Sequence, residues 1–130
     1  MSDFKIHNLR DVKDSAPEFG FGERQEARFA TEDVEAEGIG LSHHTIKPDK
    51  RQGFGHKHDE AEEVYVVIRG SGRIKLDDEV HDIKLLDAIR VAPPVVRAFE
   101  AGSDGLELIA FGPRHKGDGD LVKDFWPLST

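Results

Sequence analysis

The sequence predicts a single all-β domain, and three observations lead to that expectation. Apolar residues gather in short runs in which they alternate with polar residues, as in half-buried strands. Thirteen glycines and six prolines fall between those runs, where these residue types favour turns. A length of 130 residues suits one hydrophobic core and is too short for two. Together these features favour a β-sandwich or a β-barrel.

The expected elements run from an irregular start to an irregular end. Residues 1–25 are polar and indicate an N-terminal arm that packs weakly. The barrel is expected over residues 26–112, and residues 113–130 predict a C-terminal tail that packs on the barrel or on a partner subunit. The strands of the barrel are expected at residues 27–31, 38–46, 63–69, 73–76, 80–85, 88–92, 97–100 and 106–111.

Glycine and proline mark the expected strand ends. The segment 63–69 is the strongest strand signal because it is β-branched and aromatic, and a turn at residues 70–72 is expected to end it. Pro93 and Pro94 close another strand, because proline donates no hydrogen bond to a ladder. A further turn is expected at residues 102–105. Helical periodicity is conceivable only over residues 23–29.

Composition excludes several classes of function. Eighteen lysines and arginines against 26 aspartates and glutamates give a net charge of −8, which argues against nucleic acid or an anionic membrane as a partner. The chain has no cysteine, so a disulfide framework and a thiolate zinc site are excluded. Neither a membrane span nor a signal peptide is recognisable, and we therefore expect a cytoplasmic protein.

The most informative cluster joins two histidines to a nearby carboxylate. His56 and His58 are separated by one residue, so both imidazoles point to the same side of an extended segment. Glu63 begins the next expected strand and reaches the same region from its mouth. Two imidazoles and one carboxylate suit Fe, Mn, Ni or Zn and leave open positions for water or substrate. The alternative is that residues 56–63 form a solvated, charged loop.

The run from residue 48 to residue 70 resembles the first motif of the cupin superfamily. The matching positions of that motif are His56, His58, Glu63 and Gly70. One departure is that Asp49, or Lys50 on strict spacing, stands where the family usually has glycine. The resemblance extends over residues 39–111. It implies a double-stranded β-helix, a small jelly-roll barrel of about eight core strands with a metal site inside its mouth.

The second cupin motif is recognisable over residues 86–99, but its metal ligand is changed. Arg97 stands where the family has a histidine, and a guanidinium cannot coordinate a metal because it is always protonated. Two interpretations remain open. Either three ligands suffice and Arg97 binds a substrate carboxylate or phosphate, or Arg97 pairs with Glu63 and leaves a metal-free pocket.

Other side chains are expected to complete a ligand pocket. His43 and His44 are adjacent on a strand and face opposite sides, so one of them can point inward as a fourth ligand or a proton relay. A pair at the rim of the barrel is the alternative. Tyr65 shares a face with Glu63, and Phe99 shares one with Arg97. The expected pocket residues are therefore Arg97, Tyr65, Phe99 and His44.

The resemblance does not fix a function, because cupins include dioxygenases, isomerases, decarboxylases, sensors and storage proteins. The first hypothesis is a divalent-metal cupin, oxygenase-like or isomerase-like if it is an enzyme, for a small oxygenated or carboxylated molecule. The alternative is a non-catalytic ligand-binding or sensor cupin whose site is degenerate because of Arg97. A homodimer is expected, since pairing covers open strand edges. The arm and the tail residues Phe125 and Trp126 are candidates to reach the partner.

Overall fold

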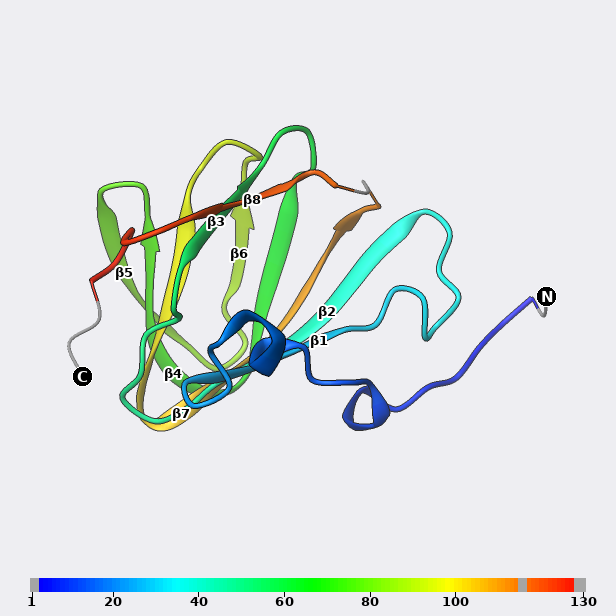
Figure 1. The fold of residues 1–130 in the computed structure, drawn as a ribbon, viewed down its shortest axis with the longest axis horizontal. Helices are drawn as coiled ribbons and strands as arrows, with labels where there is room; N and C mark the ends of the chain where they lie inside the picture. The colour runs from blue at the N-terminus through cyan, green and yellow to red at the C-terminus, as the bar shows by residue number, and fades with distance from the viewer. Residues whose placement is uncertain (1–2, 115–116, 128–130) are drawn as a thin grey trace.

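Two long strands, β4 (Glu63–Leu76) and β7 (Arg97–Pro113), form the centre of the molecule (Figure 1). They pair antiparallel from the Val64–Phe111 pair to the Leu76–Arg97 pair. The computed structural model describes residues 3–114 and 117–127. In these residues the polypeptide is almost entirely strand and turn, as the sequence predicts.

Six shorter strands extend the central pair. They are β1 (Gln25–Phe29), β2 (Ile39–Ile46), β3 (Gly55–His58), β5 (Glu79–Lys84), β6 (Ala88–Val91) and β8 (Gly119–Val122). Strand β7 pairs with β2, which pairs with β1, whereas β4 pairs with β5 and β6. Strand β3 pairs with β8 and touches the start of β7 through the His56–Arg97 pair. All these pairings are antiparallel, and the curled sheet confirms the expected jelly-roll barrel.

The sequence prediction divided both long strands at glycine-rich segments, and this division is wrong. Residues 70–72 continue β4, and residues 102–105 continue β7. A Cβ atom on Gly70 would lie 2.0 Å from the carbonyl oxygen of Gly105, so the two backbones are in direct contact there. Gly70 and Gly105 also have φ angles of +75° and +81°. These glycines therefore permit a shift in register within continuous strands, in place of a turn.

Three further expectations need correction. Residues 23–29 contain strand β1 and no helix, because Gln25 and Ala27 face inward with the alternation of a strand. Strands β3 and β8 were not among the eight expected segments. Residues 119–122 belong to the charged tail, yet they pair with β3. The described residues thus contain eight strands, which agrees with the expectation although the members of the set differ.

Part of the N-terminal arm is attached to the barrel. Two short 3-10 helices, η1 (Leu9–Asp11) and η2 (Ala16–Phe19), flank Asp14, whose Oδ1 accepts hydrogen bonds from the amides of Ala16 and Ala27 at 3.0 and 2.9 Å. Only the first described residues extend away from the sheet (Figure 1). In the described part of the chain no helix has the length and hydropathy needed to cross a membrane.

The described part of the tail also packs on its own barrel. Trp126 is buried, and the guanidinium of Arg51 lies 4.6 Å from the centre of its ring. The Phe125 ring covers Gly55, where a Cβ atom would lie 2.6 Å from it. Residues 115–116 and 128–130 of the predicted tail lie outside the described residues. The boundaries drawn at residues 25 and 112 remain predictions.

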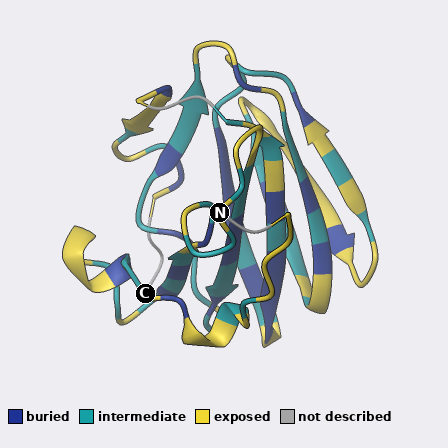
Figure 2. Cartoon of the chain, turned by 90° about the vertical axis from the view of Figure 1, so that its right-hand side faces the viewer, coloured by how far each residue is buried: buried dark blue, intermediate teal, exposed yellow. Residues whose placement is uncertain are grey.

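The apolar core fills one end of the barrel, and polar side chains reach the interior at the other end. Buried residues follow the central strands, whereas exposed residues lie at the loops, at the short helices and on outer strands such as β5 (Figure 2). Strand β4 shows this change from apolar to polar. Its inward residues Val67 and Ile74 belong to the apolar core, whereas Glu63, at the start of the strand, lines a cavity. The residues of the core are Ile46, Tyr65, Val67, Ile74, Ile83, Val91, Phe99, Ala101, Leu106, Leu108 and Ala110.

Candidate metal centre

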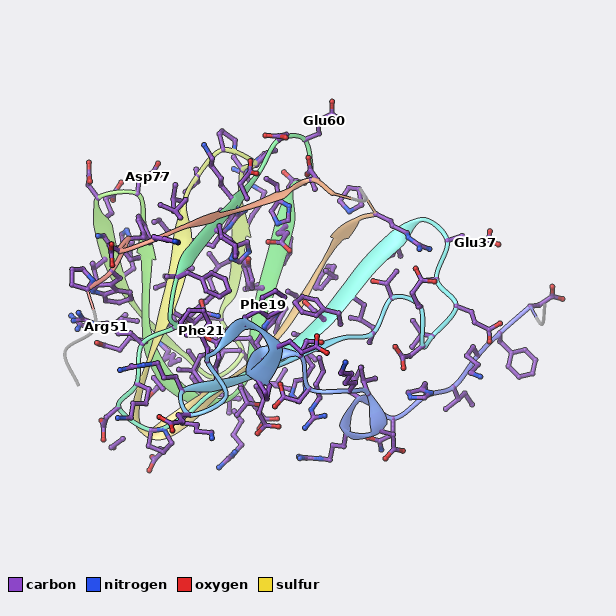
Figure 3. All side chains as sticks on the ribbon, viewed as in Figure 1. Phe19, Phe21, Glu37, Arg51, Glu60 and Asp77 are labelled. Atoms are coloured by element: carbon purple, nitrogen blue, oxygen red, sulfur yellow. The ribbon has the colours of Figure 1, made fainter. Side chains whose placement is uncertain are left out.

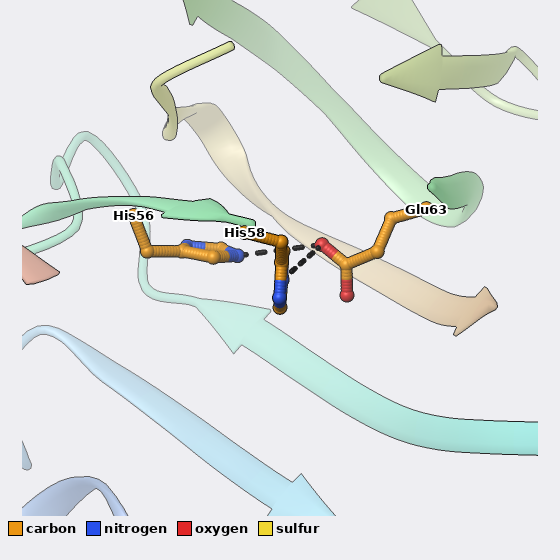
Figure 4. A group of neighbouring side chains, drawn as sticks. All are labelled: His56, His58 and Glu63. Carbon is orange, nitrogen blue, oxygen red and sulfur yellow. Dashed lines mark hydrogen bonds and ion pairs between the residues drawn. The ribbon is translucent and has the colours of Figure 1, made fainter. Parts of the chain in front are cut away.

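The three residues predicted as metal ligands lie together at the polar end of the barrel (Figure 4). Oε1 of Glu63 is 3.4 Å from Nε2 of His56 and 3.2 Å from Nε2 of His58. One potential ligand atom from each residue lies within 4.8 Å of the other two. The described residues hold no other group of three such side chains with convergent atoms.

Two features bring the three ligand atoms together: the alternation of side chains along β3, and the position of Glu63 at the start of β4. His56 and His58 occupy the same face of β3, and Lys57 between them faces the other way. Glu63 is the first residue of β4 and approaches the imidazoles from the adjoining strand (Figure 4). A loop of four residues, 59–62, joins the two strands. The position of this loop therefore decides whether the carboxylate meets the imidazoles.

Asp118 holds that loop and was missed by the sequence reasoning. Its carboxylate accepts hydrogen bonds from the amides of Asp59, Glu60 and Ala61 at distances of 3.1, 3.1 and 2.9 Å. Burial acts to raise the pKa of Asp118, but the three amide hydrogen bonds lower this pKa by more, so the net shift is downward. Asp118 is an anion that organises the β3–β4 connection. Only its place in a charged tail marks it in the sequence.

Asp118 also orients one of the imidazoles. Its Oδ2 lies 3.5 Å from Nδ1 of His58, while Nε2 of the same ring faces Glu63. Histidines that bind metals commonly present one ring nitrogen to the metal and the other to a carboxylate or a carbonyl. The arrangement of Asp118, His58 and Glu63 has that form.

Tyr65 contacts the centre directly. Its hydroxyl donates a hydrogen bond to Oε1 of Glu63 at 2.5 Å and lies 3.1 Å from Nε2 of His56. Burial and the negative charge of Glu63 raise the pKa of Tyr65 well above its usual value, so the hydroxyl keeps its proton. Burial also raises the pKa of Glu63, but hydrogen bonds from both histidines and Tyr65 bring it well below the usual value. The site therefore holds a carboxylate anion beside a phenol donor.

Arg97 lies beneath the centre and is completely buried. Its Nη2 is 3.9 Å from Oε1 of Glu63, and its guanidinium donates long hydrogen bonds, 3.5 Å each, to the carbonyl oxygens of His56 and Ala92. Phe99 is also buried and packs edge-on against Tyr65, with ring centres 4.9 Å apart. Arg97, Phe99 and the third predicted pocket residue, Tyr65, do not line the cavities described below. Their predicted contact with a ligand remains a prediction.

The adjacent histidines of β2 face opposite sides, as alternation requires. His44 lines a cavity beside the cluster, and its Nε2 lies 2.8 Å from Oγ of Ser42. Burial, together with the charge of His56, lowers the pKa of His44 to about 4 and keeps the ring neutral near pH 7. His43 points away from the cluster, and its Nε2 lies 2.8 Å from Oε1 of Glu107. His44 is thus the inward histidine.

Two cavities reach the cluster from different sides. One has a volume of about 220 Å³ and lies under the N-terminal segment and β1. The other, of about 360 Å³, opens between the ends of β2 and β7 and is bordered by Glu32 and Arg114. His58 and Glu63 line both cavities. Small molecules therefore have access to the convergent ligand atoms.

The side chains present fit a divalent transition metal. The buried ring nitrogens of His58 make no well-aligned hydrogen bond and have only carboxylate oxygens beside them, Glu63 at 3.2 Å and Asp118 at 3.5 Å, which leaves Nε2 able to bind an ion. Neighbouring ligand atoms on an ion with bonds of about 2.1 Å are roughly 3 Å apart, close to the separations of 3.2 and 3.4 Å observed here. Two imidazoles and one carboxylate are also the ligand types that such ions prefer.

No family model and no curated protein sequence matches the chain. Several solved structures are similar to it in fold. A cupin protein from Bacteroides fragilis shares 19% identity at a TM-score of 0.71, with 90% of this chain and 89% of that chain covered. The polyketide cyclase RemF from Streptomyces resistomycificus shares 19% identity at a TM-score of 0.72, with coverages of 95% and 87%.

Oxalate decarboxylase from Bacillus subtilis is similar over 93% of this chain, with 18% identity and a TM-score of 0.74. The chain spans only 32% of that enzyme. These likenesses show that the chain has the cupin fold, as its sequence motif implies. The identities are too low to transfer a reaction or a substrate, and the fold supports many chemistries.

Proposed function

We propose that this chain is a metal-binding cupin that holds a divalent transition metal through His56, His58 and Glu63 and uses it to bind a small oxygenated molecule. The observation that carries the proposal is the convergence of three ligand atoms, one each from His56, His58 and Glu63, within 4.8 Å of one another. Access from two cavities supports a site for a ligand as well as for a metal. Fe, Mn, Ni and Zn all suit the ligand set.

Each neighbouring residue has a role in this proposal. A bound ion would polarise a carbonyl or hydroxyl oxygen of the ligand as a Lewis acid. Glu63 supplies the negative charge, and Asp118 holds the His58 ring with Nε2 toward the site. Tyr65 keeps its proton and donates a hydrogen bond to Oε1 of Glu63 at 2.5 Å, which holds that oxygen beside the imidazoles. His44 presents a neutral imidazole to the same cavity.

The second candidate is a non-catalytic ligand-binding or sensor cupin. The position of Arg97 favours it, because a buried guanidinium 3.9 Å from Glu63 offsets the charge that would attract a metal. In this alternative the pocket binds its ligand without an ion. The two candidates differ in whether the purified protein holds a stoichiometric metal. An oxygenase-like or isomerase-like activity belongs only to the first.

Metal titration of the wild type and of His58→Ala tests the first candidate. We expect the wild type to bind one Mn, Ni, Zn or Fe(II) ion per chain. The variant should lose at least about a thousandfold in affinity, because two remaining ligands hold a divalent ion poorly. His81→Ala is the control, since His81 is an exposed residue of β5. Equal metal content and equal thermal shifts in wild type and His58→Ala would contradict the proposal.

A homodimer is also part of this proposal. The outer face of the central sheet exposes Ile68 and Phe111, and the start of the arm exposes Phe4 and Ile6. Covering such apolar side chains favours association. Light scattering should give about twice the chain mass of 14.5 kDa. A mass that stays at that of one chain at all concentrations contradicts the dimer.

A further inference from the structure

Four phenylalanines wall the 220 Å³ cavity that leads to the proposed metal centre. Phe19 and Phe21 come from the N-terminal segment (Figure 3), Phe29 ends β1, and Phe54 precedes β3. The ring centres of Phe21 and Phe54 are 5.0 Å apart, and those of Phe19 and Phe54 are 6.5 Å apart. These rings and that of Phe29 are called the phenylalanine cage below. Rings at such distances attract each other, and they offer the same attraction to an aromatic ring placed between them.

The cage is held by close backbone packing. A Cβ atom on Gly53 would lie only 2.0 Å from the Phe21 ring, so this ring lies directly on the Gly53 backbone. Oε1 of Gln25 accepts a hydrogen bond from the amide of Gly53 at 3.3 Å, which ties the same backbone to β1. Phe29 contacts the His44 ring edge-on at a centre-to-centre distance of 5.9 Å. The N-terminal segment is thus a fixed wall of the site.

The mouth of this cavity is apolar as well. Phe19, Phe29 and Leu121 are 51%, 53% and 57% exposed although all three line the cavity. Phe19 and Phe29 come from neighbouring segments, η2 and β1, whereas Leu121 comes from β8, far from both in sequence. Large apolar residues that stay exposed around a concave site mark a surface that a ligand covers.

The charges around the cavity restrict the ligand further. Among the described lining residues there is no lysine or arginine, and Glu63 is the only acidic residue. The other polar groups are the amides of Gln25 and Gln52, the hydroxyl of Ser42 and the imidazoles. A phosphate or a dicarboxylate would therefore find no cationic side chain there to balance its charge. A neutral or singly charged ring compound meets no such penalty.

We propose that this cavity binds a small aromatic molecule whose ring lies within the phenylalanine cage and whose hydroxyl or carbonyl oxygen faces His56, His58 and Glu63. This inference rests on the proposed function and specifies the ligand class of the same site. A dry cavity of about 150 Å³ holds benzene, so a cavity of about 220 Å³ accommodates one ring with its substituents. For a carboxylated ligand, which the first hypothesis also included, the described lining of this cavity offers no cationic side chain besides the metal itself.

Two hydroxamates provide a matched test, because they carry the same oxygen chelating group on a phenyl ring or on a methyl group. Benzohydroxamate and acetohydroxamate are titrated into the Ni-loaded wild-type protein by calorimetry. We expect the phenyl compound to bind about 10- to 100-fold more tightly, as burial of one ring implies. Equal affinities for the two compounds would overturn the inference while leaving the metal site intact.

Variants of Phe54 test whether the phenylalanine cage causes the tighter binding of the phenyl compound. Phe54→Ala should weaken benzohydroxamate about tenfold and leave the affinities for acetohydroxamate and Ni within about twofold. Phe54→Leu keeps most of the volume and should weaken benzohydroxamate about threefold, which covers the case in which the alanine variant does not fold. Phe111→Ala is the control, since Phe111 lies on the outer face of β7. A loss in the Phe111 variant equal to that in Phe54→Ala would contradict the inference.

A binding experiment on metal-free protein distinguishes this inference from the proposed function. The fluorescence of 2-naphthol, which does not chelate, reports binding to the protein in the presence of a chelator. If the chain binds no metal but binds 2-naphthol in a manner sensitive to Phe54→Ala, the aromatic site stands and the proposed metal function fails. If the chain binds metal but 2-naphthol binding is absent or insensitive to Phe54→Ala, the aromatic site fails and the metal function stands.

Discussion

The two faces of strands β2, β4 and β7 carry the same residue types in different arrangements. On the outer face, Nε2 of His43 lies 2.8 Å from Oε1 of Glu107, and Oε2 of that carboxylate lies 3.3 Å from Arg69. On the inner face, a single oxygen of Glu63 lies 3.2 Å and 3.4 Å from two imidazoles. His43 and Glu107 are both buried, whereas two cavities reach the inner group.

This difference distinguishes a structural pair from a binding site. Each oxygen of Glu107 has its own partner, and those hydrogen bonds lower its pKa although burial acts to raise it. In the inner group two imidazoles and a phenol crowd around one carboxylate oxygen, and the contact of His58 with that oxygen is not a well-aligned hydrogen bond. A histidine beside a carboxylate is therefore informative about metal binding only when several ligand atoms converge and a cavity reaches them.

The largest expected effect concerns the outer pair. His43→Ala leaves Glu107 buried with only Arg69 as a partner, and we expect a loss of about 3 kcal/mol in the free energy of unfolding. Metal affinity should not change, because His43 faces away from the site. Urea unfolding and metal titration measure the two quantities. The double variant His43→Leu/Glu107→Leu should recover most of the stability, since it leaves no unpaired buried charge. A fall in metal affinity would show that the faces are coupled.

The next effect concerns the support of the inner group. Asp118→Asn keeps an oxygen for the loop amides but removes the anion beside Nδ1 of His58. We expect a 10- to 100-fold loss of metal affinity, as is typical when the partner of a ligating histidine is changed. Asp120→Asn provides the control, because Asp120 is exposed on β8. If both variants bind metal as tightly as the wild type, Asp118 has no role in orienting the ligand.

A pH effect should arise on the inner face through His44. Its pKa falls from 6.5 to about 4 in the folded protein, with burial as the main cause and His56 as the next. Between these values the unfolded chain binds more protons, so stability is complete above pH 6.5 and decreases as the pH falls toward 4. We expect a loss of about 1 to 2 kcal/mol in metal-free protein, after allowance for partial solvent access. Urea midpoints for wild type and His44→Gln across this range measure it, and equal slopes refute the assignment.

The smallest effect concerns Arg97 and separates its two interpretations. If the guanidinium only offsets the charge of Glu63, Arg97→Met should raise metal affinity about three- to tenfold and leave oxalate binding unchanged. If Arg97 binds an anionic substrate, oxalate affinity should fall about 10- to 100-fold and metal affinity should hold. Calorimetry with both ligands, and with Arg97→Lys as the charge-conserving control, distinguishes these outcomes.

The ligand group was predictable because its geometry is mostly local. Alternation places His56 and His58 on one face of any extended segment, whatever that segment pairs with. Glu63 is only five residues beyond His58, so a short loop is enough to bring it back. The β-branched, aromatic character of the segment that begins at Glu63 likewise predicts a strand without knowledge of its neighbours. For the same reason the all-β class was correct.

Two features could not be predicted from neighbouring residues alone. They are the absence of turns at residues 70 and 105, and the face of β2 that points into the barrel. The glycines at positions 70 and 105 are equally compatible with a turn and with a register shift, and only the contact between β4 and β7 selects the second. Alternation states that His43 and His44 face opposite sides, but it does not say which side is the interior. The pairing of β2 with β7 makes that choice.

The sequence by itself determined the all-β class and the convergence of His56 and His58, because alternation along a strand depends on neighbouring residues alone. Only the tertiary structure decided the surroundings of that group. Asp118 reaches His58 through the pairing of β8 with β3, and Phe19 and Phe21 reach the cavity through the attachment of Asp14 to β1. These contacts join segments far apart in the chain, and pairings of this kind depend on the packing of the whole barrel.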